Sequence, residues 1–517
     1  MKQFIFIAMS LLIWQGCSTP EITATGKEIP RVPSSVFSAV DCKASGMASK
    51  IKTGESIVKT KTVSFPFTTL ETFKDIWKVW DQSEQQALNG SKGALLMQAI
   101  ANHYGLFMDP TVATTDDSLP MGLTLTTGSD GKHNINVNCY ACHASMINNN
   151  LIIGAGNPKF DFNSLLLDTL RQAAVATNKP INSFADLLKP VPTGLIAGRM
   201  NAEQVISTVA AAWRAKNMDL VEPSPSALNL ALTTPQADVD PQTWWNAKNK
   251  KNFMWDGQSG SDSELRNADF LSNVTAIPGL GVFGYSGEEL RGRRGDLHSL
   301  YAYSMCTETP KALAPQYQNI IGDINPDLAA DGKKIYGPNC TGCHGAYGEH
   351  GELIWYPDVF TPIGGLKTDP VRYEAASEFL LDFYRGFPSE TDDANGNLSG
   401  HASVAKQEGY QAPPLSGIWA SAPYFHNGGV PTLEDVLNEG QRPAVWKIVD
   451  DPNDMYDRKR VGLKVERLTK VPDGLSEWQS RKYYNSQLSG AKVGGHSYGY
   501  RLTETQKEAL LEYLKTL

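Results

Sequence analysis

The motif Cys-x-x-Cys-His occurs twice in this sequence, as Cys139-Tyr140-Ala141-Cys142-His143 and as Cys340-Thr341-Gly342-Cys343-His344. In this spacing the two thiols can form thioethers with the vinyl groups of one haem, and the histidine that follows can bind the iron. A four-cysteine zinc site would normally bring its two pairs within roughly 20 residues, and a thioredoxin-like dithiol needs neither the histidine nor a second copy. The motifs therefore predict two covalently bound haem c groups, with His143 and His344 as axial ligands.

The rest of the composition is that of an ordinary globular protein. The chain has 517 residues, 41% of them hydrophobic, and a formal net charge of −8, which is enough for up to three domains with real cores. The acidic balance, without a cluster of lysine and arginine, argues against nucleic-acid binding. Only the first residues form a continuous apolar run, which excludes a bundle of membrane-spanning helices.

The N-terminus is expected to direct export. Lys2 and the apolar stretch 4–14 have the pattern of a secretory signal. Gly16 before Cys17 is similar to a bacterial lipoprotein cleavage site, with a plain signal peptide as the alternative. We therefore expect a periplasmic protein or an outer-membrane lipoprotein of a bacterium, which touches a membrane only through a lipid on Cys17.

Two cysteines remain once the haem motifs and Cys17 are set aside, namely Cys42 and Cys306. Thiols in an oxidising compartment are usually paired or ligated. A disulfide between these two would suit that compartment, but the sequence leaves open whether they lie close enough to form it.

The pattern of apolar residues is mostly helical. Helical spacing predicts helices over residues 164–176, 183–188 and 202–217, whereas Gly, Asn and Asp clusters predict loops near 127–150. A capping box that starts at Thr503 predicts a final helix. The expected division is a signal peptide of lipoprotein type at 1–17, a tether or irregular arm at 18–60, a first haem c domain with a helical insertion at 61–310, and a second, cytochrome c-like haem domain at 311–517.

Residues 412–433, APPLSGIWASAPYFHNGGVPTL, resemble the second haem domain of the bacterial di-haem cytochrome c peroxidase superfamily. That superfamily also contains di-haem enzymes that modify tryptophan in partner proteins, and the di-haem rubber oxygenases. The resemblance covers both haem motifs and most of residues 320–517. It implies a mainly α fold, with two cytochrome c-like haem domains that have long loops and a helical insertion enlarging the first.

The second haem departs from the peroxidase pattern. An axial methionine of the peroxidases would fall at Gly440, and the next methionine is Met455. The segment Gly494-Gly495-His496-Ser497-Tyr498-Gly499 instead resembles the Gly-His segment that supplies the second axial histidine in the rubber-oxygenase branch. The resemblance therefore implies that His496 ligates the second iron, while His426 lies in the surroundings of the haem as a structural, hydrogen-bonding residue.

The first haem has no comparable partner on its distal side. His103 is the best remaining histidine, although a histidine at a helix C-terminus that interacts with the helix dipole explains it more simply. The rubber-oxygenase branch places a tryptophan between its haems and a phenylalanine over the reactive iron. Trp255 and Phe270 are the matching candidates for catalytic roles, with core packing as the alternative.

These ligands predict chemistry at the first haem and electron entry at the second, because a bis-histidine iron has no position for an oxygen species. The favoured function is a peroxidase-like di-haem oxidoreductase that reduces hydrogen peroxide with electrons from a small redox protein. The alternatives are an oxygenase that cleaves an organic substrate with dioxygen, and a non-catalytic electron-transfer cytochrome. Calcium occurs in such proteins, but no residues of this sequence point to it.

Overall fold

The computed structural model describes residues 38, 40–61, 68–88, 90–128, 130–177, 197–199, 239–257, 259–260, 294–378, 381 and 407–517, with a few positions between 221 and 237. Within these residues the fold is mostly helical, with small antiparallel sheets of two or three strands. The expected helices at 183–188 and 202–217 lie outside the described residues, as does Phe270. None of the described helices is long and apolar enough to cross a membrane.

The elements that surround the first haem motif belong to residues 47–305. In chain order they are α1 (Met47–Thr60), β1 (Thr68–Thr69), α2 (Leu70–Lys74), η1 (Ile76–Val79), α3 (Gln82–Leu88), α4 (Gly93–His103), β2 (Leu123–Thr127), β3 (His133–Val137), α5 (Tyr140–His143), β4 (Ala144–Ile147), β5 (Asn150–Ile153), α6 (Phe162–Thr177), α10 (Trp244–Ala247), β6 (Asn252–Phe253), β7 (Ser259–Gly260) and α13 (Arg294–Met305).

The elements that surround the second motif follow. They are η2 (Pro315–Tyr317), α14 (Gln318–Ile321), α15 (Pro326–His344), β8 (Ala346–Tyr347), β9 (Leu353–Trp355), β10 (Phe360–Thr361), α16 (Ile363–Leu366), α17 (Val371–Ala375), β11 (Tyr410–Gln411), η3 (Ile418–Ala420), α19 (Leu433–Leu437), η4 (Glu439–Gln441), β12 (Val445–Ile448), β13 (Tyr456–Asp457), β14 (Gly462–Leu463), β15 (Val465–Leu468), α20 (Glu477–Ser480), β16 (Tyr483–Asn485), η5 (Ser497–Arg501) and α21 (Glu504–Lys515).

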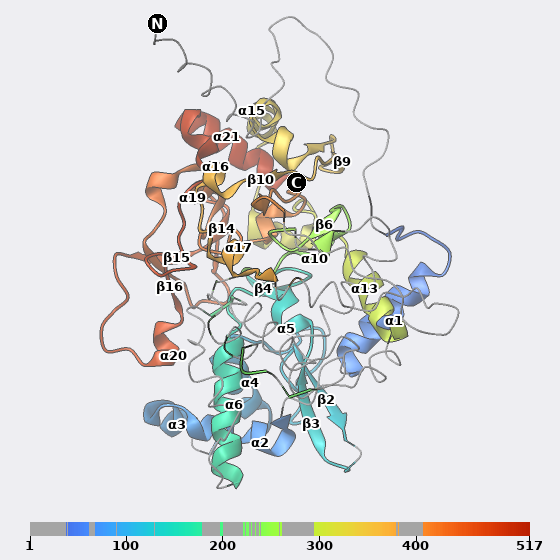
Figure 1. Ribbon diagram of the computed structural model, residues 1–517, viewed down its shortest axis with the longest axis vertical. Coiled ribbons are helices and arrows are strands. Elements are labelled where there is room, and N and C mark those ends of the chain that lie inside the picture. The colour runs from blue at the N-terminus through green and yellow to red at the C-terminus, as the bar shows by residue number, and fades with distance from the viewer. Residues whose placement is uncertain are drawn as a thin grey trace, which may run out of the picture.

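The elements from α2 to α4, the strands β2 and β3, and α6 lie in the lower half of Figure 1, where the three helices α2, α4 and α6 lie near the sheet β1-β3-β2. The expectation of a loop over residues 127–150 was wrong at β3, β4 and the start of β5. The Asn-rich stretch forms strands because its isoleucines are buried: Ile135 lies in the core beside α4, and Ile147 packs in the core of the C-terminal part. The expected helix at 164–176 is confirmed as α6.

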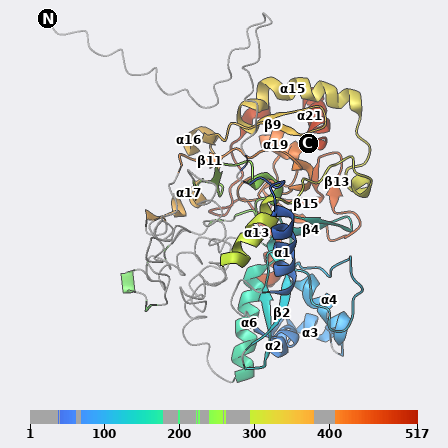
Figure 2. The ribbon, with the colours of Figure 1, turned by 90° about the vertical axis from the view of Figure 1, so that its right-hand side faces the viewer.

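Helices α1 and α13 lie side by side in both views (Figures 1 and 2). Their backbones approach closely at Gly54, where a Cβ atom would come within 2.0 Å of the Ser299 carbonyl oxygen. Residues 47–60 were expected to belong to an irregular arm, but they form a helix. Burial of Ile57 and Val58 against neighbouring elements stabilises this helix.

The C-terminal part is built on the crossing of α15 and α21, at the top of both views (Figures 1 and 2). Gly332 allows this contact, since a Cβ atom there would lie 2.0 Å from the Ala509 carbonyl oxygen. The predicted final helix is confirmed as α21, with Thr503 and Gln506 forming the capping box. Leu510 and Leu514 on its inner face are almost fully buried.

One segment of the C-terminal part extends to the elements of the N-terminal part. The sheet β15-β12-β16 and the short helix α20 carry the chain there, and α20 lies near α3 in Figure 1. Arg481, just after α20, makes a buried ion pair with Asp161 at the start of α6, with an N–O distance of 2.6 Å. The two parts are therefore joined by side chains as well as by the backbone.

Candidate haem-binding sites

The second haem motif ends α15, so that His344 is the last residue of a long helix. Its Nδ1 atom lies 2.7 Å from the carbonyl oxygen of Pro413 and donates a hydrogen bond to it. This bond orients the ring and leaves Nε2 as the nitrogen with a free lone pair, the arrangement that metal-binding histidines commonly adopt. Burial lowers the pKa of His344, with the Pro413 carbonyl opposing the shift. The ring is therefore neutral and able to bind a metal.

His496 faces His344. The two ring centres are 6.1 Å apart and the ring planes make an angle of 62°. Two imidazoles that bind one metal ion from opposite sides, each at about 2 Å, have ring centres about 6 Å apart. Burial, with the charges of His344 and Arg442 as smaller causes, lowers the pKa of His496 to about 3. The structure thus brings these two histidines together at a separation that fits a shared haem iron.

The backbone around His496 is held by charged residues of the neighbouring segment. His496 has a positive φ of 51°, and the adjacent Gly495 lies so close to α16 that a Cβ would be 2.0 Å from the Leu366 carbonyl oxygen. Arg442 donates to the carbonyl oxygens of Gly495 and Val493 at 2.7 Å and 2.6 Å. The Gly495 amide in turn donates to Glu439 at 2.8 Å. These bonds fix the position of the imidazole.

The first motif lies in the short helix α5, between two hydrophobic clusters. Cys139 packs with the cluster that contains Tyr140, whereas Cys142 packs with the core beside α4. Burial raises the pKa of Cys139 to about 11 and that of Cys142 to about 12. The surroundings therefore do not activate these thiols as thiolate nucleophiles. The apolar surroundings suit the attachment of a large apolar group.

His143, the axial candidate of the first motif, is buried at the end of α5. Burial lowers its pKa to about 4, and the backbone of Gln242 opposes the shift without reaching hydrogen-bond geometry at Nδ1. Its ring centre is 5.3 Å from that of Trp244, with the planes tilted by 31°. Within the described residues, the aromatic neighbour of His143 is thus a tryptophan, whereas that of His344 is a second imidazole.

Helix α10 connects the surroundings of the two motifs, and sequence reasoning missed it. Trp244 contacts His143, and the Trp245 indole donates to the Ser416 carbonyl oxygen at 2.7 Å. Asn246 donates to the carbonyl oxygens of Pro414 and Ser416 at 3.1 Å and 3.0 Å. Pro414 directly follows the residue that holds His344. The adjacent pair of tryptophans was the available signal in the sequence.

Trp255, the tryptophan singled out from the sequence, lies close to this connection. Its indole donates to the Asp240 carbonyl oxygen at 2.9 Å, and its own carbonyl accepts from the Gln411 amide at 2.8 Å. The ammonium group of Lys250 lies 5.8 Å from its ring centre. Trp255 therefore lies beside β11. Its partner Gln411 is two residues before Pro413, whose carbonyl accepts the hydrogen bond from His344.

His426 is buried, with 4% of its surface exposed. Its ring stacks on Tyr410 at 4.1 Å, and its carbonyl oxygen accepts from the Asp240 amide. The preceding residue, Phe425, has its ring 5.8 Å from that of His496. Burial, followed by the charge of Arg372, lowers the pKa of His426 to about 3. His426 thus packs against Tyr410, while the adjacent Phe425 faces His496.

His103 ends α4 and is enclosed in an aromatic stack. It lies parallel between Trp80 at 3.6 Å and Trp478 at 4.1 Å, and both pairs of rings are 4° from parallel. Its Nδ1 is 3.4 Å from the carboxylate of Glu84. A ring held in this way joins α4 to α20 and contacts neither haem motif through its faces.

Cys42 and Cys306 form a disulfide, with Cα atoms 5.6 Å apart. The sequence left this pairing open. The bond ties the segment before α1 to the end of α13, and it agrees with an exported protein.

Residues 409–447, which contain His426, match the family described as RoxA-like, cytochrome c-like. A cytochrome c-like domain implies haem c, which agrees with the second Cys-x-x-Cys-His motif preceding it. A solved structure of hydrazine synthase from Kuenenia stuttgartiensis is 17% identical, with coverage of 61% of this chain and 86% of that chain. Its TM-score is 0.24, which is too low to indicate a common fold.

Two curated proteins of Sinorhizobium fredii are also similar. The uncharacterised protein y4iJ is 28% identical in an alignment 248 positions long, and the match covers 38% of this chain. The uncharacterised protein y4iM is 28% identical in an alignment 134 positions long, and the match covers 23% of this chain. The matches span 40% and 30% of the length of these relatives. The match at residues 409–447 indicates a haem-containing redox protein with a cytochrome c-like domain in its C-terminal part.

Proposed function

We propose that this protein is a di-haem c-type oxidoreductase in which electrons enter at the second haem and a peroxidase reaction takes place at the first. The observation that carries the proposal is the contrast between the two axial candidates. His344 has a second imidazole opposite it at 6.1 Å, whereas the ring that lies against His143, among the residues that the structure describes, is that of Trp244.

In this proposal Cys340 and Cys343 hold one haem, and Cys139 and Cys142 hold the other. A bound haem supplies one-electron redox chemistry and, where its sixth position is open, a place for peroxide to bind. His344 and His496 would occupy both axial positions at the second site, and their neutral rings suit that role.

Helix α10 is the proposed route between the two sites. Trp244 lies against His143, and the hydrogen bonds of Asn246 and Trp245 end on the segment that holds His344. An indole can be oxidised and reduced again, so it can relay an electron. Hydrogen-bonded contacts shorten the gaps that the electron must cross between the two sites. Trp255, which also borders that segment, is the alternative relay.

The electron donor in this proposal is a small redox protein, and the protein is exported, with a lipid on Cys17 as its membrane anchor. The disulfide between Cys42 and Cys306 and the cytochrome c-like domain agree with export. The donor and the anchor are inferences from the sequence.

A di-haem oxygenase is the second candidate, and the RoxA-like match at residues 409–447 favours it. The first haem would then bind dioxygen, and the substrate would be an organic compound. The ligands proposed for the second haem are the same in both cases.

Spectra of the purified protein, together with assays for the two oxidants, test the proposal. We expect two haems per chain in a pyridine haemochrome assay, one low-spin and one high-spin in the oxidised protein. Catalytic oxidation of a reduced cytochrome by hydrogen peroxide would support the peroxidase. Oxygen uptake with an unsaturated hydrocarbon, without peroxide, would support the oxygenase instead. Two low-spin haems without either activity would indicate an electron-transfer cytochrome.

A further inference from the structure

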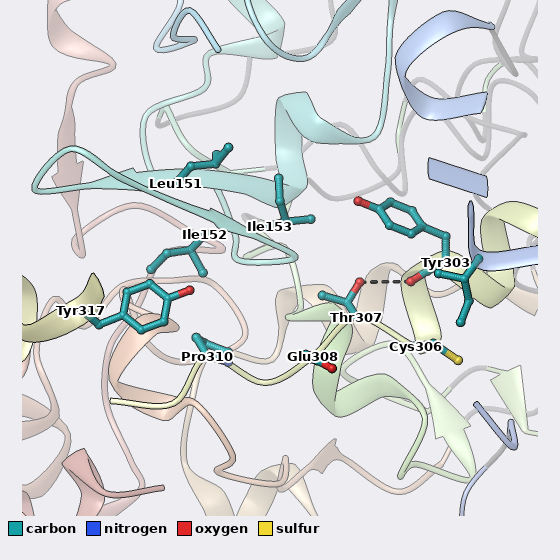
Figure 3. Close-up of a pocket in the computed structure, with 10 residues that line it drawn as sticks. Leu151, Ile152, Ile153, Tyr303, Cys306, Thr307, Glu308, Pro310 and Tyr317 are labelled. Carbon is teal, nitrogen blue, oxygen red and sulfur yellow. Dashed lines mark hydrogen bonds between the residues drawn. The ribbon is translucent and has the colours of Figure 1, made fainter. Parts of the chain in front are cut away.

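A pocket of about 330 Å³ opens between α1, β5 and the segment that follows α13. Its wall is mixed: polar groups such as Thr307 and Glu308 share it with aliphatic side chains. Ile152 and Ile153 lie on one side, and Pro310 and the ring of Tyr317 lie close to Ile152 (Figure 3). Glu308 is exposed and is the one charged side chain among the described residues that line it. The volume lies at the lower end of the range of roughly 300–1,000 Å³ that is usual for small-molecule sites.

The wall of this pocket belongs to the same hairpin as the first haem motif. Strand β5 pairs with β4, which starts directly after His143, and the Gly154 amide donates to the His143 carbonyl oxygen at 2.8 Å. On the other side Tyr317 packs against Trp419 in the core of the C-terminal part, with ring centres 5.2 Å apart. The pocket therefore lies where the two haem parts of the chain meet.

A tyrosine pair connects the pocket to the motif. Tyr303 lines the pocket, and its hydroxyl is 2.7 Å from that of Tyr140, which lies within the Cys-x-x-Cys-His sequence. Burial raises the pKa of both phenols, that of Tyr303 to about 12, so both are protonated at neutral pH. The hydroxyl–hydroxyl contact ties Tyr303 in the pocket wall to the first motif.

Aromatic rings continue this connection as far as the axial histidine. The ring centre of Tyr303 is 5.8 Å from that of Trp244, and Tyr140 is 6.4 Å from the same indole. Trp244 is in turn 5.3 Å from His143. Oxidisable side chains therefore lead in two steps from the pocket to the first haem site.

We propose that this pocket binds a small phenol, which reduces the first haem as a second electron donor, beside the redox protein that reduces the second haem. The aliphatic side chains suit the apolar face of a single aromatic ring, and the phenolic hydroxyl can donate a hydrogen bond to the carboxylate of Glu308. The same carboxylate disfavours ligands that carry an acid group. This inference rests on the proposed function, because hydrogen peroxide is the oxidant.

The reaction balances for two phenols and one peroxide. Each phenol loses one electron through Tyr303 and Trp244, and gives its hydroxyl proton to Glu308 and from there to water. One hydrogen peroxide takes up the two electrons and two protons, its O–O bond breaks, and two water molecules form. The products are two phenoxyl radicals, which leave the pocket and couple in solution.

Calorimetric titration of the holoprotein with 4-methylphenol tests the site without any turnover. Ile51 lines the pocket from α1, so Ile51→Trp is expected to fill it and weaken binding more than about tenfold. Lys50→Trp places the same side chain on the exposed face one position away and is expected to leave the affinity within about twofold. Saturable binding that Ile51→Trp does not weaken would overturn the proposal, and so would no binding at all.

A second variant is safe for folding, because Glu308 is exposed. Glu308→Gln is expected to weaken 4-methylphenol by about threefold to tenfold and to leave 4-methylanisole, which has no hydroxyl donor, unchanged. Equal effects on both ligands would contradict the assigned hydrogen bond.

The electron route has its own measurement. Tyr303→Phe is expected to lower kcat for 4-methylphenol about tenfold and to change KM less than about threefold. An unchanged kcat would overturn the route. If the protein binds the phenol but consumes no peroxide with any donor, the proposed function fails and the site stands. If it consumes peroxide but does not bind the phenol, only this inference fails.

Discussion

Asn246 donates its side-chain amide to the carbonyl oxygen of Pro414 at 3.1 Å, although the two residues are 168 positions apart in the sequence. The carbonyl of the preceding residue, Pro413, is the one that orients His344. Two residues before Asn246, the ring of Trp244 lies against His143. One turn of helix therefore contacts the surroundings of both candidate axial histidines.

The opposed pair of imidazoles gives the most direct prediction. His496→Ala is expected to convert one low-spin haem to high-spin and to leave two covalent haems per chain, because the side chain is needed for ligation and not for attachment. His496→Met should restore a low-spin spectrum with a higher reduction potential, since a thioether is a weaker donor to ferric iron. The exposed His350 provides the control, and His350→Ala should leave the spectrum unchanged. A low-spin spectrum that survives in His496→Ala would assign the ligand elsewhere.

Covalent attachment can be tested one motif at a time. The double substitution Cys340→Ala and Cys343→Ala is expected to leave one haem per chain after acid–acetone extraction, and to remove the bis-histidine spectrum. The matching change at Cys139 and Cys142 should also leave one haem but preserve that spectrum. Loss of both haems in either variant would show that attachment at the two motifs is interdependent.

The sequence predicted the parts of the molecule that local chemistry determines. The Cys-x-x-Cys-His motif is recognisable because all of its residues lie within five positions. The capping box predicts α21 for the same reason, since Thr503 and its partner Gln506 are three positions apart. His496 was found through a resemblance, and the structure places its ring centre 6.1 Å from that of His344, while its role as a ligand stays a prediction. Met455, the next candidate ligand, lies in the hydrophobic core of the C-terminal part.

Features that depend on distant segments could not be predicted. Helix α1 was expected to be irregular, since its sequence alone does not reveal α13 as the partner that buries Ile57. The role of α10 is hidden for the same reason: Trp244 contacts His143 and Trp245 bonds to Ser416, and both partners lie far away in the chain. The Cys42–Cys306 pairing is equally a property of the tertiary fold.

The disulfide offers a stability prediction. Replacing Cys42 and Cys306 with serine is expected to lower the free energy of unfolding by about 2–4 kcal/mol, because the bond closes a very long loop in the unfolded chain. Haem content should stay at two per chain, since neither cysteine belongs to a haem motif. Thermal melts of the oxidised parent, the reduced parent and the variant provide the measurement. Equal melting temperatures for all three would contradict the expectation.

A comparison of two tryptophans tests the proposed electron route between the haems. Trp244→Phe is expected to slow electron transfer from the second haem to the first by about tenfold or more, because phenylalanine is much harder to oxidise and fills the space less well. Trp255→Phe is the matched comparison and should change this rate less than about threefold. Flash reduction of the second haem, followed by optical detection of the first, measures the rate. The reverse order of the two effects would make Trp255 the relay.

The buried pair of Asp161 and Arg481 predicts how the contact between the two parts responds to acid. Burial alone would raise the pKa of Asp161, but Arg481 and Ser164 outweigh it and hold the pKa below its ordinary value. A carboxylate with a depressed pKa in the folded state stabilises the fold above its unfolded pKa of about 4, and this contribution is lost as the pH falls through the folded value.

Asp161→Asn should therefore cost about 3–5 kcal/mol at pH 7, since it leaves the Arg481 charge buried without its carboxylate. The difference between parent and variant should shrink steadily below about pH 4, where the parent loses the same charge by protonation. Urea unfolding at a series of pH values measures both quantities, and a stability difference that stays constant from pH 7 to pH 2 would contradict the pairing. Because Arg481 follows α20, the loss should be visible first in the contact of Trp478 with His103, as a change in tryptophan fluorescence that precedes global unfolding.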